Sequence, residues 1–210
     1  MVADDQGRQC EGGVRLAGNS GRQAIEALME KYGAGAIIVS AYDPNWPALF
    51  EQERARIQAA LGGLVLAVEH VGSTAVPGLP SKPIIDLLVG VPSLDEAQQR
   101  YVEPVKALGY VYMPQYESWL PGELFFRKGP PGPWTHHVHV MQLSHPRWEQ
   151  LVLFRDYLRA HPEAAHAYAD IKRELARASN DDIAAYRNGK SAFVEATTAR
   201  ALAWKTERES

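Results

Sequence analysis

An acid inside an otherwise apolar segment is the first feature of this sequence that suggests chemistry. Asp86 lies in PIIDLLVGV, whose nearly continuous apolar residues predict a strand over residues 83–91 that is buried on both faces. An ionised carboxylate costs several kcal/mol to desolvate unless a cation or an ion pair compensates it. We therefore expect Asp86 at a polar opening, where it either binds a divalent cation or forms a purely structural ion pair with Lys82 or an arginine.

Two histidines on a second expected strand offer related chemistry. His137 and His139 are two residues apart in THHVHVMQL, so they project from one face of a strand. Imidazole rings bind metals, donate hydrogen bonds to phosphate and transfer protons. The alternatives are a surface pair or two core histidines bonded to backbone groups. Arg127, in LFFRKG, is expected on a strand of the same sheet, where its guanidinium would bind anions.

A loop of small residues precedes the strand of the acid. It begins with Gly72, Ser73 and Thr74, which let backbone N–H groups approach an anion closely. Lys82 adds a positive charge at its end. The loop lacks the Gly-Lys-Ser/Thr sequence of a Walker A motif, so the pattern alone does not identify a phosphate-binding loop.

The C-terminal part of the chain repeats a Tyr-x-x-x-Lys spacing. Tyr168 precedes Lys172 and Tyr186 precedes Lys190 by four residues, which places each pair on one helix face a turn apart. Both lysines are then candidates for phosphate binding. The alternative is a packed tyrosine with a solvated lysine in each helix.

The elements that must position these residues follow an α+β pattern. Strands are expected at 36–42, 64–71, 83–91, 110–113, 123–128 and 137–143. Helices are expected at 22–32, 48–61, 93–108, 144–160, 162–178 and 181–204. The chain is thus divided into a flexible leader over 1–21, an α/β core over 22–143 and a helical region over 144–210 packed on that core.

Composition and charge narrow the function classes. The 210 residues are 46% hydrophobic, which is enough for a sizeable core. The net charge of -3 disfavours nucleic acid as a partner, because non-specific binding needs a basic field. The single cysteine, Cys10, cannot form an internal disulfide, and no apolar run reaches the roughly 20 residues of a membrane span. We expect a cytoplasmic protein with a small-molecule ligand and no membrane association.

Five segments of the sequence resemble the GrpB family. They are YDPNWPALFEQE, EHVGSTAVPGLPSKPIIDLLV, THHVHV, LFRDYLRAHPEAAHAYADIKRELA and YRNGK, and the resemblance extends from about residue 36 to residue 204. That family is similar to the nucleotidyltransferases of polymerase-β type, in which a Gly-Ser turn binds nucleotide phosphates and acids on the following strands bind Mg²⁺. The resemblance implies an α+β fold with a nucleotidyltransferase-like mixed β-sheet flanked by helices and a C-terminal helical region. It also implies that Gly72 and Ser73 form the phosphate turn and that Asp86 is the first metal-binding acid.

One position departs from the superfamily pattern. A second carboxylate is expected two residues after the first, and Leu88 occupies that position. His137 or His139 stands where the third acid would be sought. Two-metal catalysis needs several carboxylates, whereas one aspartate and two histidines suffice for a single divalent cation. Mg²⁺ and Mn²⁺ prefer oxygen ligands and imidazole favours Zn²⁺ or Fe²⁺, so the identity of the cation stays open.

Three functions are compatible with these residues. The first is a nucleotidyltransferase-like protein that binds a nucleotide or another phosphorylated or anionic small molecule and transfers a nucleotidyl group to a small acceptor. The second is a catalytically degenerate nucleotide-binding or anion-binding module, and the third is different metabolite chemistry with His137 or His139 as acid or base. The expected catalytic and metal-binding residues are Asp86, His137 and His139. The expected phosphate-binding residues are Gly72, Ser73, Thr74, Lys82, Arg127, Tyr168, Lys172, Tyr186 and Lys190.

Overall fold

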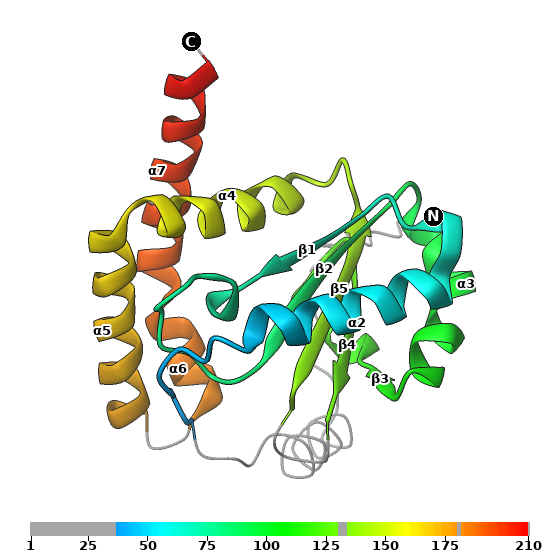
Figure 1. Ribbon diagram of the computed structural model, residues 1–210, viewed down its shortest axis with the longest axis horizontal. Coiled ribbons are helices and arrows are strands. Elements are labelled where there is room, and N and C mark those ends of the chain that lie inside the picture. The colour runs from blue at the N-terminus through cyan, green and yellow to red at the C-terminus, as the bar shows by residue number, and fades with distance from the viewer. Residues whose placement is uncertain (1–36, 130–133, 180–181, 210) are drawn as a thin grey trace, which may run out of the picture.

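The computed structural model describes residues 37–129, 134–179 and 182–209, and its centre is a five-stranded mixed sheet (Figure 1). The strands are β1 (Ala67–Val71), β2 (Ile85–Val91), β3 (Tyr110–Tyr112), β4 (Glu123–Lys128) and β5 (His136–Gln142). Their order in the sheet is β1-β2-β5-β4-β3. The central pair β2 and β5 is parallel, and the other neighbours are antiparallel.

Two helices cover one face of the sheet. They are α2 (Trp46–Leu61), with Pro47 in its first turn, and α3 (Leu94–Ala107), whose N-cap Ser93 accepts a hydrogen bond from the backbone N–H of Glu96. The apolar residues of α2 recur at helical spacing and pack with Leu87 and Val89 of β2 in the main core. This face of the sheet is therefore sealed by apolar side chains.

Four C-terminal helices form the second layer of the molecule. They are α4 (Pro146–Ala160), α5 (Pro162–Ala178), α6 (Ile183–Gly189) and α7 (Ser191–Glu209). Trp148 of α4 packs against Leu88 and Met141 on the opposite face of the sheet, and α5 packs against the loop of Val76 and Leu79. In Figure 1 the C-terminal end of α7 extends beyond the rest of the molecule. The α+β class, with a mixed sheet flanked by helices and a helical C-terminal region, is confirmed.

Three expected elements differ in the structure. The strand expected over 36–42 is only an isolated bridge between Ser40 and Ser81. The strand expected over 64–71 begins at Ala67, because a 3-10 turn, Gly62–Leu64, follows α2. The helix expected over 181–204 is divided into α6 and α7 at Gly189, where an added Cβ would overlap the side chain of Leu175 in α5.

Several expectations concern parts of the chain outside the described residues. These are the leader over 1–21 and the helix over 22–32. Within the described ranges, no helix combines the length and the apolar character that crossing a membrane requires.

Candidate functional site

The two central strands place the acid and both histidines on one face of the sheet. Their register pairs Asp86 of β2 with His137 of β5, and Leu88 with His139. Paired residues of neighbouring strands project to the same side, here the side of the C-terminal helices. Arg127 of β4 pairs with His137 and shares this face. Residues more than fifty positions apart in the sequence therefore meet at the centre of the sheet.

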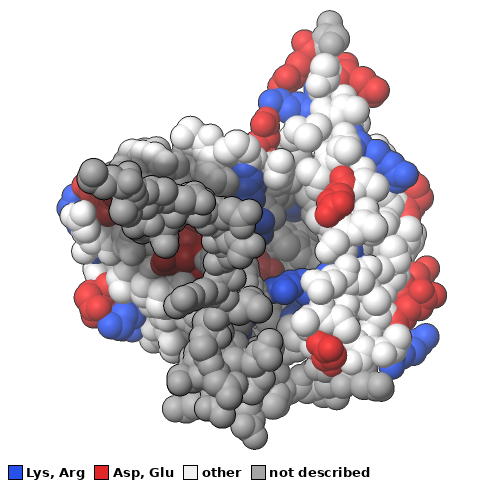
Figure 2. All heavy atoms as spheres, turned by 180° about the vertical axis from the view of Figure 1, so that it is seen from behind, with Lys and Arg blue, Asp and Glu red and all other residues white. Residues whose placement is uncertain are grey.

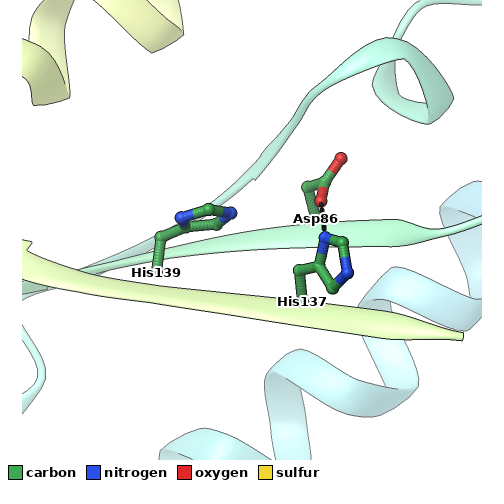
Figure 3. Close-up of side chains that lie close together, drawn as sticks. All are labelled: Asp86, His137 and His139. Atoms are coloured by element: carbon green, nitrogen blue, oxygen red, sulfur yellow. Dashed lines mark hydrogen bonds and ion pairs between the residues drawn. The ribbon is translucent and has the colours of Figure 1, made fainter. Parts of the chain in front are cut away.

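Asp86, His137 and His139 form a cluster that can bind a metal ion (Figure 3). One potential ligand atom of each residue lies within 4.8 Å of the others. Nδ1 of His137 is 3.0 Å from Oδ1 of Asp86, and Nε2 of His137 is buried without a hydrogen-bond partner among the described residues. A donor set of one carboxylate oxygen and two imidazole nitrogens suits Zn²⁺ or Fe²⁺ better than Mg²⁺ or Mn²⁺.

A buried acid on β4 supports one of the two histidines. Oε1 of Glu123 is 3.0 Å from Nδ1 of His139, and the side chain of Glu123 is only 2% exposed. Metal-binding histidines commonly donate their other ring N–H to a carboxylate in this way. Sequence reasoning missed Glu123, although it lies two residues before Phe125 and four before Arg127 on the same strand face. The period-two spacing along the strand could thus have placed Glu123 on the same face as Arg127.

Burial influences the pKa values of both Asp86 and His137. It lowers the pKa of His137 to about 4, although the neighbouring carboxylate of Asp86 favours the protonated ring. Burial alone would raise the pKa of Asp86, but the hydrogen bond from His137 and the nearby positive groups outweigh it and hold that pKa below its ordinary value. At neutral pH the pair is a neutral imidazole beside an ionised carboxylate, which is the protonation state that metal binding requires.

The loop of small residues turns directly beside the acid. Gly72 adopts φ +71°, and an added Cβ at this position would overlap Oδ2 of Asp86. Ser73 begins a short 3-10 turn, Ser73–Ala75. Because a side chain at position 72 would both strain the backbone and displace the carboxylate, only glycine lets the turn approach Asp86 this closely.

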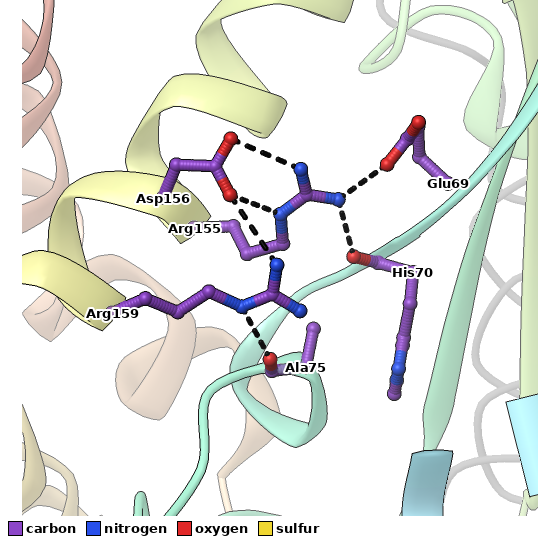
Figure 4. Close-up of polar contacts among 6 residues, drawn as sticks. All are labelled: Glu69, His70, Ala75, Arg155, Asp156 and Arg159. Atoms are coloured by element: carbon purple, nitrogen blue, oxygen red, sulfur yellow. Dashed lines mark hydrogen bonds and ion pairs between the residues drawn. The ribbon is translucent and has the colours of Figure 1, made fainter. Parts of the chain in front are cut away.

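An arginine network ties this turn to the C-terminal helices (Figure 4). Nη1 of Arg155 donates to the carbonyl oxygen of His70 at 3.0 Å and to Glu69 at 2.6 Å. Nε of Arg159 donates to the carbonyl oxygen of Ala75 at 2.9 Å. Two consecutive turns of α4 therefore hydrogen-bond to the backbone on both sides of the Gly-Ser turn, which fixes its position relative to α4.

The cluster and the turn border a cleft of about 400 Å³ in which cations predominate. Among the described residues, its lining contains a single carboxylate, that of Asp86, against five cationic side chains, namely Lys82, Arg127, Lys172, Arg187 and Lys190. Figure 2 shows Lys and Arg side chains around the hollow at the centre of this face. The local charge is thus strongly positive although the whole chain carries -3.

Both Tyr-x-x-x-Lys pairs point into this cleft. Nζ of Lys172 lies 4.7 Å from the ring centroid of Tyr168 and also donates to the carbonyl oxygen of Pro80. Nζ of Lys190 lies 4.5 Å from the ring centroid of Tyr186, across the end of α6 rather than within one continuous helix. Neither lysine is a solvated helix residue, because both line the cleft and Lys172 is only 2% exposed.

Burial and mutual repulsion make the cleft lysines easier to deprotonate. Burial, assisted by the charges of Lys190 and Arg173, lowers the pKa of Lys172 to about 7. Burial and the charge of Lys82 lower the pKa of Lys190 to about 8, although Asp86 opposes this effect. Burial also lowers the pKa of Lys82. A bound anion would relieve this repulsion and favour the charged form of each lysine.

One expected phosphate-binding residue lies elsewhere. Thr74 is fully buried and does not line the cleft. Its hydroxyl is 3.0 Å from Nε2 of His70 and donates to the carbonyl oxygen of Ile84 at 3.1 Å. Thr74 therefore joins the turn to the strands on either side of it. The structure brings all the other expected site residues to the cleft.

The position of the missing second carboxylate is part of the apolar core. Leu88 is fully buried, and it packs with Val71 and Met141 beneath Trp148 of α4. A carboxylate at this position would be desolvated among apolar side chains. The leucine that stands in the sequence where a second carboxylate was expected is therefore a core residue, and β2 contributes one acid to the site.

Comparison with known proteins assigns the family. The sequence model described as GrpB protein matches residues 36–200. The chain belongs to the GrpB family. A crystal structure of the conserved protein GrpB from Enterococcus faecalis superimposes with a TM-score of 0.73 at 38% identity, covering 80% of this chain and 99% of that one.

Two curated relatives of the GrpB chain are longer proteins. UPF0157 protein YqkA of Bacillus subtilis is 37% identical over 88% of this chain and 52% of its own length. UPF0157 protein PA4798 of Pseudomonas aeruginosa is 45% identical over 77% of this chain and 66% of its own length. The chain thus spans about half of the first relative and just under two thirds of the second.

Proposed function

We propose that this GrpB protein binds a small phosphorylated molecule together with one divalent cation. The observation that carries this proposal is the charge of the cleft, where, in the described part of the chain, five cationic side chains surround one carboxylate. Burial, together with the repulsion between neighbouring like charges, lowers the pKa values of Lys172 and Lys190. Such an arrangement is stable when an anion occupies it, and phosphate groups carry the most suitable charge and hydrogen-bond acceptors.

The cation would bind to Asp86, His137 and His139. Their burial, the ionised state of Asp86 and the neutral state of His137 support this assignment. Glu123 supports it as well, since its hydrogen bond leaves Nε2 of His139 free to act as a ligand. The nitrogen donors favour Zn²⁺ or Fe²⁺ over Mg²⁺ or Mn²⁺. A bound cation would supply positive charge next to the phosphates at the Gly72 turn.

Binding is favoured over nucleotidyl transfer as the function of this site. Transfer by two metal ions needs several carboxylates, and Leu88 fills one of the required positions with an apolar side chain. Phosphate binding, in contrast, needs only the groups that already line the cleft. The proposal therefore concerns the ligand and its cation, and transfer to an acceptor would be an additional activity of the same groups.

Titration calorimetry with pyrophosphate tests the anion part of the proposal. Replacing Lys190 with Met removes one cation from the cleft and should weaken pyrophosphate binding by about 1.5 to 3 kcal/mol, the value of a hydrogen bond to a charged group. Lys106→Met is the matched control, because Lys106 is an exposed residue of α3 that pairs with Glu103. Equal affinities in the parent and the Lys190 variant, or no binding at all, would refute the proposal.

A second titration addresses the cation. The parent should bind Zn²⁺, and Asp86→Asn should lose that binding while its circular dichroism spectrum stays unchanged, because Asn keeps the side-chain volume and removes the charge. An Asp86→Asn protein that binds Zn²⁺ as tightly as the parent would contradict the metal assignment. If the variant unfolds instead and the parent binds no metal, Asp86 is a structural partner of His137.

A further inference from the structure

A second groove opens directly beside the cleft. It encloses about 530 Å³, and five residues line both spaces. The shared residues are Tyr116, Trp119, Arg127, Arg187 and Lys190. A ligand whose phosphates occupy the cleft can therefore continue into the groove without leaving the protein surface.

Aromatic rings and guanidinium groups form the wall between the two spaces. Trp119 is 55% exposed, which is unusual for an indole side chain, and its ring is perpendicular to that of Tyr116 at a centroid distance of 5.7 Å. The guanidinium of Arg187 lies 4.9 Å from the ring centroid of Trp119, and that of Arg127 lies 4.7 Å from the ring centroid of Tyr116. The wall thus presents planar aromatic rings that pack against planar guanidinium groups.

The groove, like the cleft, is lined by more positively than negatively charged side chains. Its lining, as far as the structure describes it, contains four cations, Arg127, Arg147, Arg187 and Lys190, and one carboxylate, that of Glu195. An uncharged apolar ligand gains little from such a lining, because the guanidinium groups would lose water without gaining a partner. A flat, hydrogen-bonding ring attached to a negatively charged group satisfies both the aromatic surfaces and the cations.

We propose that the groove binds the planar ring of a ligand whose phosphates occupy the cleft, and that the ligand is therefore a nucleotide rather than an inorganic or sugar phosphate. Nucleobases stack on aromatic side chains and on arginine planes, and both are present at Trp119 and Arg187. Arg187 lines both spaces, so it can contact the base on one side and a phosphate on the other. This inference rests on the proposed function, since the cleft must hold the phosphates.

The test compares ligands that share their phosphates and differ in the ring. Inorganic tripolyphosphate and the nucleoside triphosphates ATP, GTP, CTP and UTP are titrated into the full chain, with and without Zn²⁺. The best nucleotide should bind about 10-fold more tightly than tripolyphosphate, a difference typical of stacking one base. Trp119→Ala should remove most of that difference and leave tripolyphosphate binding unchanged. Leu66→Ala, which shortens another exposed apolar side chain outside both spaces, is the control.

A second pair of variants distinguishes the contact of Arg187 with the ligand ring from a general effect of removing a positive charge. Arg187→Gln should weaken nucleotide binding more than tripolyphosphate binding, whereas Arg177→Gln, at an exposed site in the last turn of α5, should change neither. If all triphosphates bind the parent as weakly as tripolyphosphate, or if Trp119→Ala weakens every probe equally, the ring site is refuted and the proposed function stands. If no probe binds under either condition, the proposed function fails and this inference fails with it.

Discussion

Glu123 of β4 accepts a hydrogen bond from Nδ1 of His139 on β5 at 3.0 Å, and a ring nitrogen of the same histidine points toward Asp86 (Figure 3). A carboxylate can only accept, so this hydrogen bond places a proton on Nδ1 and directs Nε2 away from Glu123. The acid on one strand thereby sets the tautomer of a candidate metal ligand on the next. This relationship connects a fully buried residue with the chemistry of the cleft.

Replacing Glu123 with Gln should weaken Zn²⁺ binding by about 10-fold to 100-fold, the usual effect of losing an outer-shell partner. The reason is that the amide lacks the charge that favours Nδ1–H and can present its own N–H instead. Titration calorimetry of the full chain measures the effect, and Glu149→Gln is the control because Glu149 is exposed and pairs with Lys205. A variant that loses stability but keeps its Zn²⁺ affinity would show that Glu123 is a core residue without influence on the site.

Gly72→Ala should abolish pyrophosphate binding and destabilise the fold. Gly78→Ala is a matched control, because Gly78 also has a positive φ, +78°, but a Cβ there would meet no atom within 4 Å. Both variants should lose about 1 to 2 kcal/mol of unfolding free energy from backbone strain, measured by urea denaturation. Only the first forces the new methyl group into the carboxylate of Asp86. If Gly72→Ala binds pyrophosphate as tightly as the parent, the turn is not part of the binding site.

The stability of the ligand-free protein should rise with pH between about pH 7 and pH 10, and Lys172 should account for part of the rise. Its folded-state pKa is about 7, whereas an unfolded lysine has an ordinary pKa of about 10.5. In that window the unfolded chain binds a proton that the folded chain does not, so unfolding becomes less favourable as the pH increases. Melting temperatures of the parent and of Lys172→Met, measured across this range, should diverge least at high pH. Parallel curves would mean that the lysine keeps its proton in the folded state.

Arg155→Gln should cost about 2 kcal/mol of unfolding free energy. The substitution leaves the carbonyl oxygen of His70 without its donor and removes the ion pair to Glu69. Arg173→Gln, which breaks only an exposed pair with Asp170, should cost less than about 0.5 kcal/mol. Urea denaturation of both variants provides the comparison. A loss for Arg155→Gln no larger than that of the control would show that the network does not hold the turn.

The core of the site could be predicted from local sequence patterns. Asp86 was recognisable because a charged residue in an apolar strand needs a compensating partner, and His137 and His139 because alternate residues of a strand share a face. The lysines of the two Tyr-x-x-x-Lys pairs could be placed on helix faces, but only the packing of α5 and α6 shows that both enter the cleft. The placement of these side chains could be predicted where a single element carried the whole pattern.

Features that depend on pairing between distant elements were less accessible. The hydrogen bond between Glu123 and His139 depends on the register of β4 and β5, which no local spacing encodes. The expected strand at 36–42 had the right composition, but Ser40 forms an isolated bridge with Ser81 there instead of a strand. The break between α6 and α7 arises from the close approach of Leu175 to Gly189, a contact between two helices. Thr74 has a residue type that suits phosphate, yet burial directs its hydroxyl to His70.

The parallel pairing of β2 with β5 has a consequence for how the molecule folds. Asp86 and His137 are 51 residues apart in the chain, and Lys172 lies 92 residues from its acceptor at Pro80. Closing such long loops is entropically unfavourable until the whole sheet and its covering helices are in place, so these contacts form late in folding. A ligand that needs all of them can stabilise only the completed structure. Bound ligand should therefore slow unfolding while leaving the rate of folding almost unchanged.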